Sequence, residues 1–122
     1  MTEYNLIDSS VWISYLVNGN HKDLIEAQEK LLLATISIIE IRKKLNKLKI
    51  SSKEIIKKVD YIKKQSILIS LDENVADKAS QIVIEKNIPV ADSIIYASAI
   101  ANNAILITLD NDFRNLKSVK VL

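Results

Sequence analysis

Apolar and polar positions alternate along the chain in two distinct periods. Short runs of apolar residues, the pattern of strands, are separated by longer segments in which apolar residues recur every three or four positions, as in helices. The predicted strands cover residues 4–7, 32–35, 66–70, 104–108 and 118–122. The runs "SILIS" and "AILIT" are almost entirely apolar, which is typical of strands buried on both faces.

Helical periodicity fills the segments between these strands. The predicted helices cover residues 9–17, 22–31, 37–49, 52–64, 72–87 and 92–103. Ser51 and Glu54 have the spacing of a capping pair at the start of one helix, and Pro89 follows the end of another. Strands that alternate with helices require crossover connections, so we predict an α/β fold with a mostly parallel sheet covered by helices on both faces.

Length and composition predict one folded domain over residues 1–122. The chain has 122 residues, of which 48% are hydrophobic and 26% charged, and it contains one Gly, one Pro and no Cys. This composition excludes a disordered chain, disulfides, thiolate metal sites and cysteine nucleophiles. No run of about 20 apolar residues is present, so we expect no membrane span and a cytoplasmic location.

The charge is distributed unevenly although the net value is only +2. Residues 42–64 hold ten Lys and Arg against two acids, a local net of +8, whereas the rest of the chain carries −6. Two interpretations remain open. The lysines either form the solvated faces of two helices, or they form a phosphate-facing surface for a polyanion. Lys43, Lys44 and Lys47 are the candidate residues for binding such a polyanion.

Acidic residues gather where the predicted strands end, which is the edge at which open parallel sheets bind ligands. They are Asp8, Glu40, Asp72, Asp92, Asp110 and Asp112. Taken singly, each has an ordinary explanation. Asp8, Asp72 and Asp92 suit helix N-caps, and the two acids of "LDNDF" suit a turn. Taken together, carboxylates at one edge raise one another's pKa unless a cation joins them.

Glu40 follows an apolar run, and its position depends on the helix around it. In projection, Ile38, Ile41, Leu45 and Leu48 form one face, and Glu40 points away from it in line with three lysines. Alone, it would be a surface ion pair with Lys43 or Lys44. In the company of the other acids it is a candidate ligand for Mg²⁺ or Mn²⁺, which prefer oxygen donors. The predicted reaction class is metal-dependent phosphodiester hydrolysis.

Four segments also resemble the motifs of PIN-domain nucleases, in the same order and over nearly the whole chain. "LIDSSVWISYL" is similar to the opening Asp motif, and "TISIIEIRKKL" to the second motif with its single Glu. "VADSIIYASAIANNAILITLDNDF" is similar to the third and fourth motifs. At this length, the chain looks most like a toxin ribonuclease of the VapC type.

The resemblance implies a three-layer α/β/α sandwich with a five-stranded, mostly parallel sheet. It implies Mg²⁺ or Mn²⁺ bound by catalytic acids at Asp8, Glu40, Asp92 and Asp110, with Asp112 as a further ligand. Ser9, Ser10 and Thr108 match the supporting hydroxyls of the family. The implied substrate is RNA, and the implied partners are a VapB-type antitoxin and a second copy of the chain.

Three other classes compete with this interpretation. A receiver-type signalling domain would have paired acids after the first strand, and a phosphatase would have an Asp-x-Asp motif there, whereas "DSS" has one acid. A non-catalytic RNA- or protein-binding domain on the same scaffold remains an alternative. Among the remaining residues we expect His21 on the surface, and Trp12, Tyr15 and Tyr96 in packing contacts.

Overall fold

The computed structural model describes residues 4–27 and 29–122. Its strands are β1 (Tyr4–Ile7), β2 (Leu31–Ala34), β3 (Ser66–Ile69), β4 (Ala104–Thr108) and β5 (Val119–Val121). Its helices are α1 (Ser9–Asn18), α2 (Lys22–Ile25), α3 (Thr35–Lys47), α4 (Ser52–Gln65), α5 (Glu73–Lys86), α6 (Val90–Ala101) and the 3₁₀ turn η1 (Asn111–Phe113). All strand pairs are parallel, in the order β3-β2-β1-β4-β5. The predicted α/β class is therefore confirmed.

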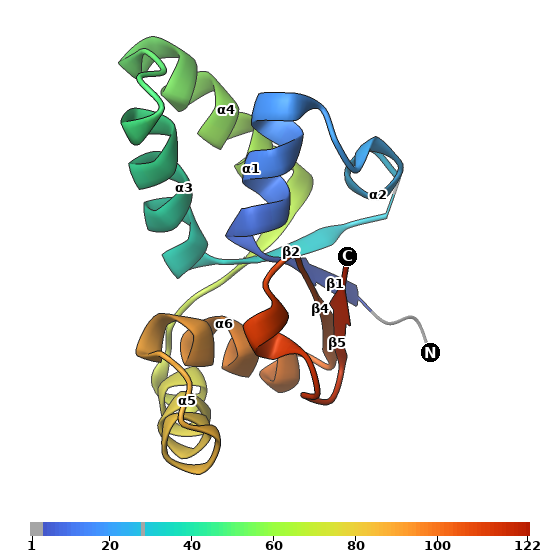
Figure 1. Cartoon of the computed structure of the whole chain (residues 1–122), viewed down its shortest axis with the longest axis vertical. Helices are drawn as coiled ribbons and strands as arrows, with labels where there is room; N and C mark the ends of the chain where they lie inside the picture. Colours follow the sequence, from blue (N-terminus) through green and yellow to red (C-terminus); the bar gives the residue numbers. More distant parts are fainter. Residues whose placement is uncertain (1–3, 28) are drawn as a thin grey trace.

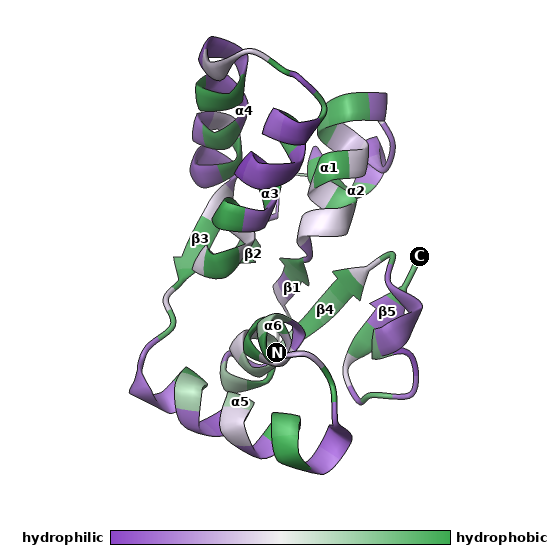
Figure 2. Cartoon of the chain, turned by 60° about the vertical axis from the view of Figure 1, so that its left-hand side comes forward, coloured by the Kyte–Doolittle hydropathy of each residue, from purple (hydrophilic) through white to green (hydrophobic). Residues whose placement is uncertain are grey.

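Helices cover the sheet on both sides, which makes three layers. The segment from α1 to α4 lies on one side and the α5–α6 pair on the other (Figure 1). Alternate strand residues supply the two cores, as the strand period requires. Ile7, Leu33 and Ile107 face the first group of helices. Leu6 and Leu106 pack with α6 and with Phe113 of η1. Strands β3 and β4 are mostly in the hydrophobic colour, whereas α3, α4 and α5 carry both hydrophobic and hydrophilic bands (Figure 2).

The site predicted at the strand ends coincides with a topological feature. β1 is central: the chain runs outward from it through β2 to β3, and then crosses back to β4 on the other side of β1. The register pairs Leu6 with Leu32 and with Leu106, so three neighbouring strands end at similar heights. In open parallel sheets, ligands bind outside the carboxyl ends of the strands at such a switch point.

Two predicted elements were wrong in extent or in burial. The helix expected over 22–31 ends at Ile25, because Leu31 is recruited into β2 beside β1; Gln28 lies outside the described residues. "SILIS" is not buried on both faces, since β3 is an edge strand whose Ile67 and Leu68 are each 41% exposed. The other strands are displaced by at most one residue from their predicted ends.

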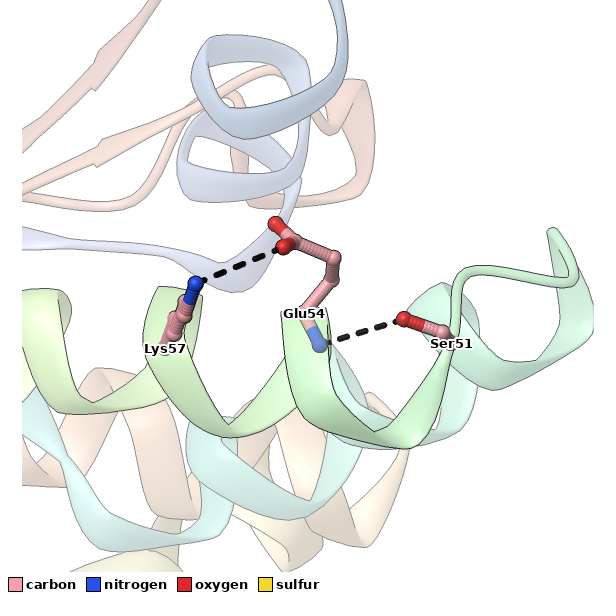
Figure 3. Close-up of polar contacts among 3 residues, drawn as sticks. All are labelled: Ser51, Glu54 and Lys57. Atoms are coloured by element: carbon pink, nitrogen blue, oxygen red, sulfur yellow. Dashed lines mark hydrogen bonds and ion pairs between the residues drawn. The ribbon is translucent and has the colours of Figure 1, made fainter.

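Helix capping explains two of the polar positions and does not explain a third. Asp72 caps α5 by accepting a 2.9 Å hydrogen bond from the amide of Val75, and Ser51 caps α4 by accepting one of 3.2 Å from Glu54 (Figure 3). Asp92 was expected to open its helix but does not cap it, because α6 begins at Val90 after Pro89. Its carboxylate is therefore not used as a cap. Across the described ranges, no helix is long and apolar enough to cross a membrane.

Candidate active site

Asp8 is a buried carboxylate between β1 and α1. It is 5% exposed, and its amide donates to the carbonyl of Ile107 on the neighbouring strand. Oδ1 accepts a 2.8 Å bond from the amide of Ser9, which makes Asp8 the N-cap of α1. Oδ2 accepts hydroxyl hydrogen bonds from Ser10 (2.9 Å) and Thr108 (2.7 Å). Helix capping thus explains one oxygen, whereas the other is oriented by side chains from two elements.

The two hydroxyls that contact Asp8 also bind the chain after β4. The amide of Leu109 donates to Oγ of Ser10 at 3.1 Å, and the amide of Asp110 donates to Oγ1 of Thr108 at 3.0 Å. Thr108 has no exposed surface. Because each hydroxyl joins β1 or α1 to the β4 loop, the network fixes the position of Asp110 relative to Asp8.

Glu40 lies on α3 and faces the start of α1. Its Oε1 accepts a 3.2 Å hydrogen bond from the hydroxyl of Ser9, which also lies 3.5 Å from Oδ1 of Asp8. Burial raises the pKa of Glu40, and the negative charges of Asp8 and Asp92 raise it further, while the bond from Ser9 lowers it. Glu40 is therefore electrostatically linked to both aspartates.

The sequence-based placement of Glu40 opposite the core face was wrong. The buried positions of α3 are Ser37, Ile41 and Leu45, so Glu40 lies at the flank of that face and is partly buried against α1. Leu48, expected in the core, is 45% exposed at the end of the helix. The face is rotated because α3 packs on α1 as well as on α4.

The lysines near Glu40 do not neutralise it. Lys43, Lys44 and Lys47 are exposed on α3, and the only ion pair among the described residues joins Lys57 to Glu54. The ion-pair explanation of Glu40 therefore has no support in the geometry.

Asp92, Asp110 and Asp112 form the closest acidic group. Each offers a carboxylate oxygen, and these oxygens all lie within 4.8 Å of one another. Asp112 is held at the start of η1, where its amide donates a 2.9 Å bond to Oδ1 of Asp110. Phe113, buried in the core beside α6, anchors the same turn.

The pKa of Asp92 reflects this crowding. Burial, and then the charges of Asp110, Asp8 and Asp112, raise it from 3.8 to about 6. A carboxylate whose pKa is raised by its acidic neighbours is relieved by a cation placed among them. The donor set is entirely oxygen, which suits Mg²⁺ or Mn²⁺ better than softer metals. The residues present therefore fit a hard divalent cation.

The structure brings the sequence-predicted acids together in two groups. The charges of one group raise the pKa of carboxylates in the other. Asp92, Asp110 and Asp112 make one group. Asp8 and Glu40 make the other and lie outside the 4.8 Å set, linked to each other through Ser9. Three hollows of the described surface lie away from the acids: between α1 and α4, over the β4–β5 face beside α2, and between α5 and α6. His21 lines the second of these and is partly exposed, which agrees with the surface position expected for it.

The comparisons with known proteins agree with this fold. The family model of the PIN domain matches residues 6–119, so the chain belongs to the PIN domain family. A comparison with curated protein sequences gives no match.

Several solved structures have the same fold at low sequence identity. A toxin–antitoxin complex from Klebsiella pneumoniae superposes with a TM-score of 0.81 at 18% identity, covering 96% of each chain. DNA-bound VapBC from Salmonella typhimurium gives 0.78 at 14% identity over 99% of this chain and 98% of that one. VapC20 of Mycobacterium tuberculosis, a toxin that cleaves the sarcin–ricin loop, gives 0.75 at 12% identity over 96% and 98%. At these identities the likeness establishes the fold alone.

Proposed function

We propose that the protein is a metal-dependent endoribonuclease and the toxin of a VapBC-type pair, with residues 1–122 forming one nuclease domain. The observation that carries this proposal is the convergence of five carboxylates at the switch point of the sheet, three of them within 4.8 Å. Membership of the PIN family and the likeness to VapBC structures support it. RNA is the proposed substrate, and a VapB-type antitoxin in the cytoplasm the proposed partner. A homodimer is also proposed.

The proposed role of each acid follows from its position in the site. Asp92, Asp110 and Asp112 would hold the ion together with Asp8, whose Oδ2 is oriented by Ser10 and Thr108. When bound, a Mg²⁺ or Mn²⁺ ion would orient and acidify water and stabilise charge on the phosphate. Such an ion also offsets the repulsion among these carboxylates, which explains why the fold tolerates them so close together.

Glu40 is suited to proton transfer as well as to metal binding. Ser9 contacts Oε1 and leaves Oε2 without a hydrogen bond among the described residues. The pKa of Glu40 is raised toward neutral pH, and a general base works best when its pKa lies near the pH of the reaction. We propose that Oε2 accepts a proton from the attacking water. The exposed Lys43, Lys44 and Lys47 on the same helix would attract the RNA backbone.

The test is cleavage of RNA by the purified protein with Mg²⁺ or Mn²⁺ and with EDTA. Asp8→Asn, Asp92→Asn and Glu40→Gln should each reduce metal-dependent cleavage at least a hundredfold with the fold retained. Glu85→Gln, an exposed acid on α5, is the matched control. Undiminished cleavage by the Asp8 and Asp92 variants would sink the proposal. RNA binding without any cleavage would favour the non-catalytic alternative.

A further inference from the structure

A hollow of about 450 Å³ lies between the end of α1 and the first half of α4; we call it the α1–α4 pocket. Its chemically distinctive lining residues are Tyr15, Tyr61, Lys22, Lys57, Lys58 and Glu54. Three ammonium groups and two aromatic rings around one hollow are the components of single-stranded nucleic-acid sites, in which cations follow the backbone and rings stack on bases. None of the acids of the candidate active site lines it.

The aromatic part of the pocket is held in place from the core outward. Trp12, which is fully buried, packs edge-on against Tyr15 with ring centroids 6.2 Å apart. Tyr15 and Tyr61 are stacked at 6.2 Å with an interplanar angle of 17°. The hydroxyl of Tyr15 donates a 2.6 Å bond to Glu26 and lies 3.2 Å from that of Tyr61. The rings therefore present a fixed surface to a ligand, which lowers the entropy cost of binding.

The charged part of the pocket is positive and accessible. Lys57 lies 3.8 Å from Glu54, and the side chains of both are more than half exposed. Figure 3 shows both on the side of α4 that faces the N-terminal part of the chain. Lys22 and Lys58 add two further positive charges, so three lysines outnumber two carboxylates, Glu54 in the lining and Glu26 on the hydroxyl of Tyr15. This imbalance favours an anionic ligand over a neutral or cationic one.

Helix α1 connects this pocket to the acidic centre. Its first residue, Ser9, contacts Asp8 and Glu40, and its later residue Tyr15 lines the pocket. Tyr15 comes six positions after Ser9, a rise of about 9 Å along the helix axis. A single strand lying along α1 would therefore reach both places.

We propose that the α1–α4 pocket binds a nucleotide of the RNA substrate outside the scissile linkage, with phosphate at Lys22, Lys57 and Lys58 and the base against Tyr61. This inference rests on the proposed function, because it assigns a subsite to the same substrate. The pocket would then set which part of an RNA lies across the acids.

The first test measures binding of a short fluorescein-labelled single-stranded RNA by anisotropy in EDTA, so that cleavage plays no part. The Lys57→Ala/Lys58→Ala variant should bind about tenfold more weakly, and the slope of its salt dependence should fall by roughly 0.7 for each phosphate that a lysine no longer neutralises. Lys63→Ala/Lys64→Ala removes the same charge from exposed positions of the same helix outside the pocket. This control should change the affinity by less than about twofold. If both variants lose the same RNA affinity, the loss reflects the net charge of the protein and not the pocket, and the proposal is overturned.

The second test separates stacking from charge. Tyr61→Phe keeps the ring and should bind RNA as the unsubstituted protein does, whereas Tyr61→Leu should bind about fivefold or more weakly. The two variants are compared at equal folded fraction, measured by circular dichroism. If Tyr61→Leu binds RNA normally, or if both variants lose the same affinity, the proposed stacking of a base on Tyr61 is wrong.

These results are independent of whether the protein cleaves RNA. If the protein does not cleave RNA with metal but still binds RNA through the pocket, the proposed function is wrong. The pocket would then remain an RNA-binding site. Cleavage and RNA binding unchanged in the Lys57/Lys58 variant, with weaker binding of a co-expressed antitoxin, would overturn the subsite and assign the pocket to a protein partner.

Discussion

The hydroxyl of Thr108 donates a 2.7 Å hydrogen bond to Oδ2 of Asp8, a residue 100 positions earlier in the chain. The same oxygen of Thr108 accepts the amide of Asp110 at 3.0 Å. One buried hydroxyl therefore links the carboxylate after β1 to the acids after β4. The link spans the pair of strands on which the sheet reverses its order.

Thr108→Val tests this link. The substitution keeps the shape of the side chain but leaves Oδ2 of Asp8 with one donor and the amide of Asp110 without its acceptor. We expect a loss of about 1–3 kcal/mol in the free energy of unfolding and a clear reduction in metal-dependent RNA cleavage. Urea unfolding and a cleavage assay measure the two effects.

Ser98→Ala is the matched control for that experiment. Ser98 is also buried, but its hydroxyl donates to the carbonyl of Ile94 within α6 and touches none of the acids. It should reduce stability without a comparable loss of cleavage. Parallel losses in both variants would mean that Thr108 acts through stability alone.

The pKa of Asp92, about 6 in the folded protein, predicts how stability depends on pH. Between pH 4 and 6 the folded state binds more protons at this residue than the unfolded state does, so stability falls as pH rises through that range. Asp92→Asn should flatten this dependence and make the metal-free protein more stable at pH 7 to 8. Thermal unfolding in EDTA across this pH range measures both effects.

Asp60→Asn, an exposed acid on α4 outside the acidic group, should leave the pH profile unchanged. If Asp92→Asn lowered the melting temperature at neutral pH, the repulsion inferred among the acids would be wrong.

Asp110 and Asp112 can be distinguished by metal binding. Mn²⁺ or Mg²⁺ should raise the melting temperature of the protein by mass action, more at pH 8 than at pH 5 because protons compete for the same carboxylates. Asp110 is partly buried and Asp112 exposed, so Asp110→Asn should weaken the metal-induced rise more than Asp112→Asn does. Calorimetric titration with Mn²⁺ provides a second measure, and a larger effect of Asp112→Asn would reverse the assignment.

Asp72→Ala examines an acid that we assign to folding alone. Its carboxylate caps α5, so its loss should cost about 1 kcal/mol of stability. Cleavage of RNA by the folded protein should be unchanged. A selective loss of cleavage would show that the acidic centre extends to the end of β3.

Periodicity predicted the strands well because each is bounded by a change of period. β4 begins and ends as predicted, whereas β2 begins one residue earlier than predicted. It could not predict that β3 lies at an edge, since strand order depends on pairing between distant segments. "SILIS" and "AILIT" look alike, yet Leu68 is 41% exposed and Leu106 is fully buried.

In the candidate site, too, some features could be predicted from the sequence and others depend on tertiary packing. Asp8 and Asp110 follow strands, so their common edge could be predicted from the parallel sheet. The partial burial of Glu40 and its bond to Ser9 depend on the packing of α3 against α1, which a helical projection does not contain. The α1–α4 pocket was not predicted for a similar reason. Tyr15 and Tyr61 are 46 positions apart, and only the excess of lysine over residues 42–64 indicated a basic surface.

The order of the strands also has a consequence for synthesis. β1 is made about 100 residues before its neighbour β4, which has Thr108, Asp110 and Asp112 at its end. A nascent chain, or a product truncated before residue 108, lacks this half of the acidic centre. Any activity that depends on the centre is therefore withheld until β4 and the turn after it have been made.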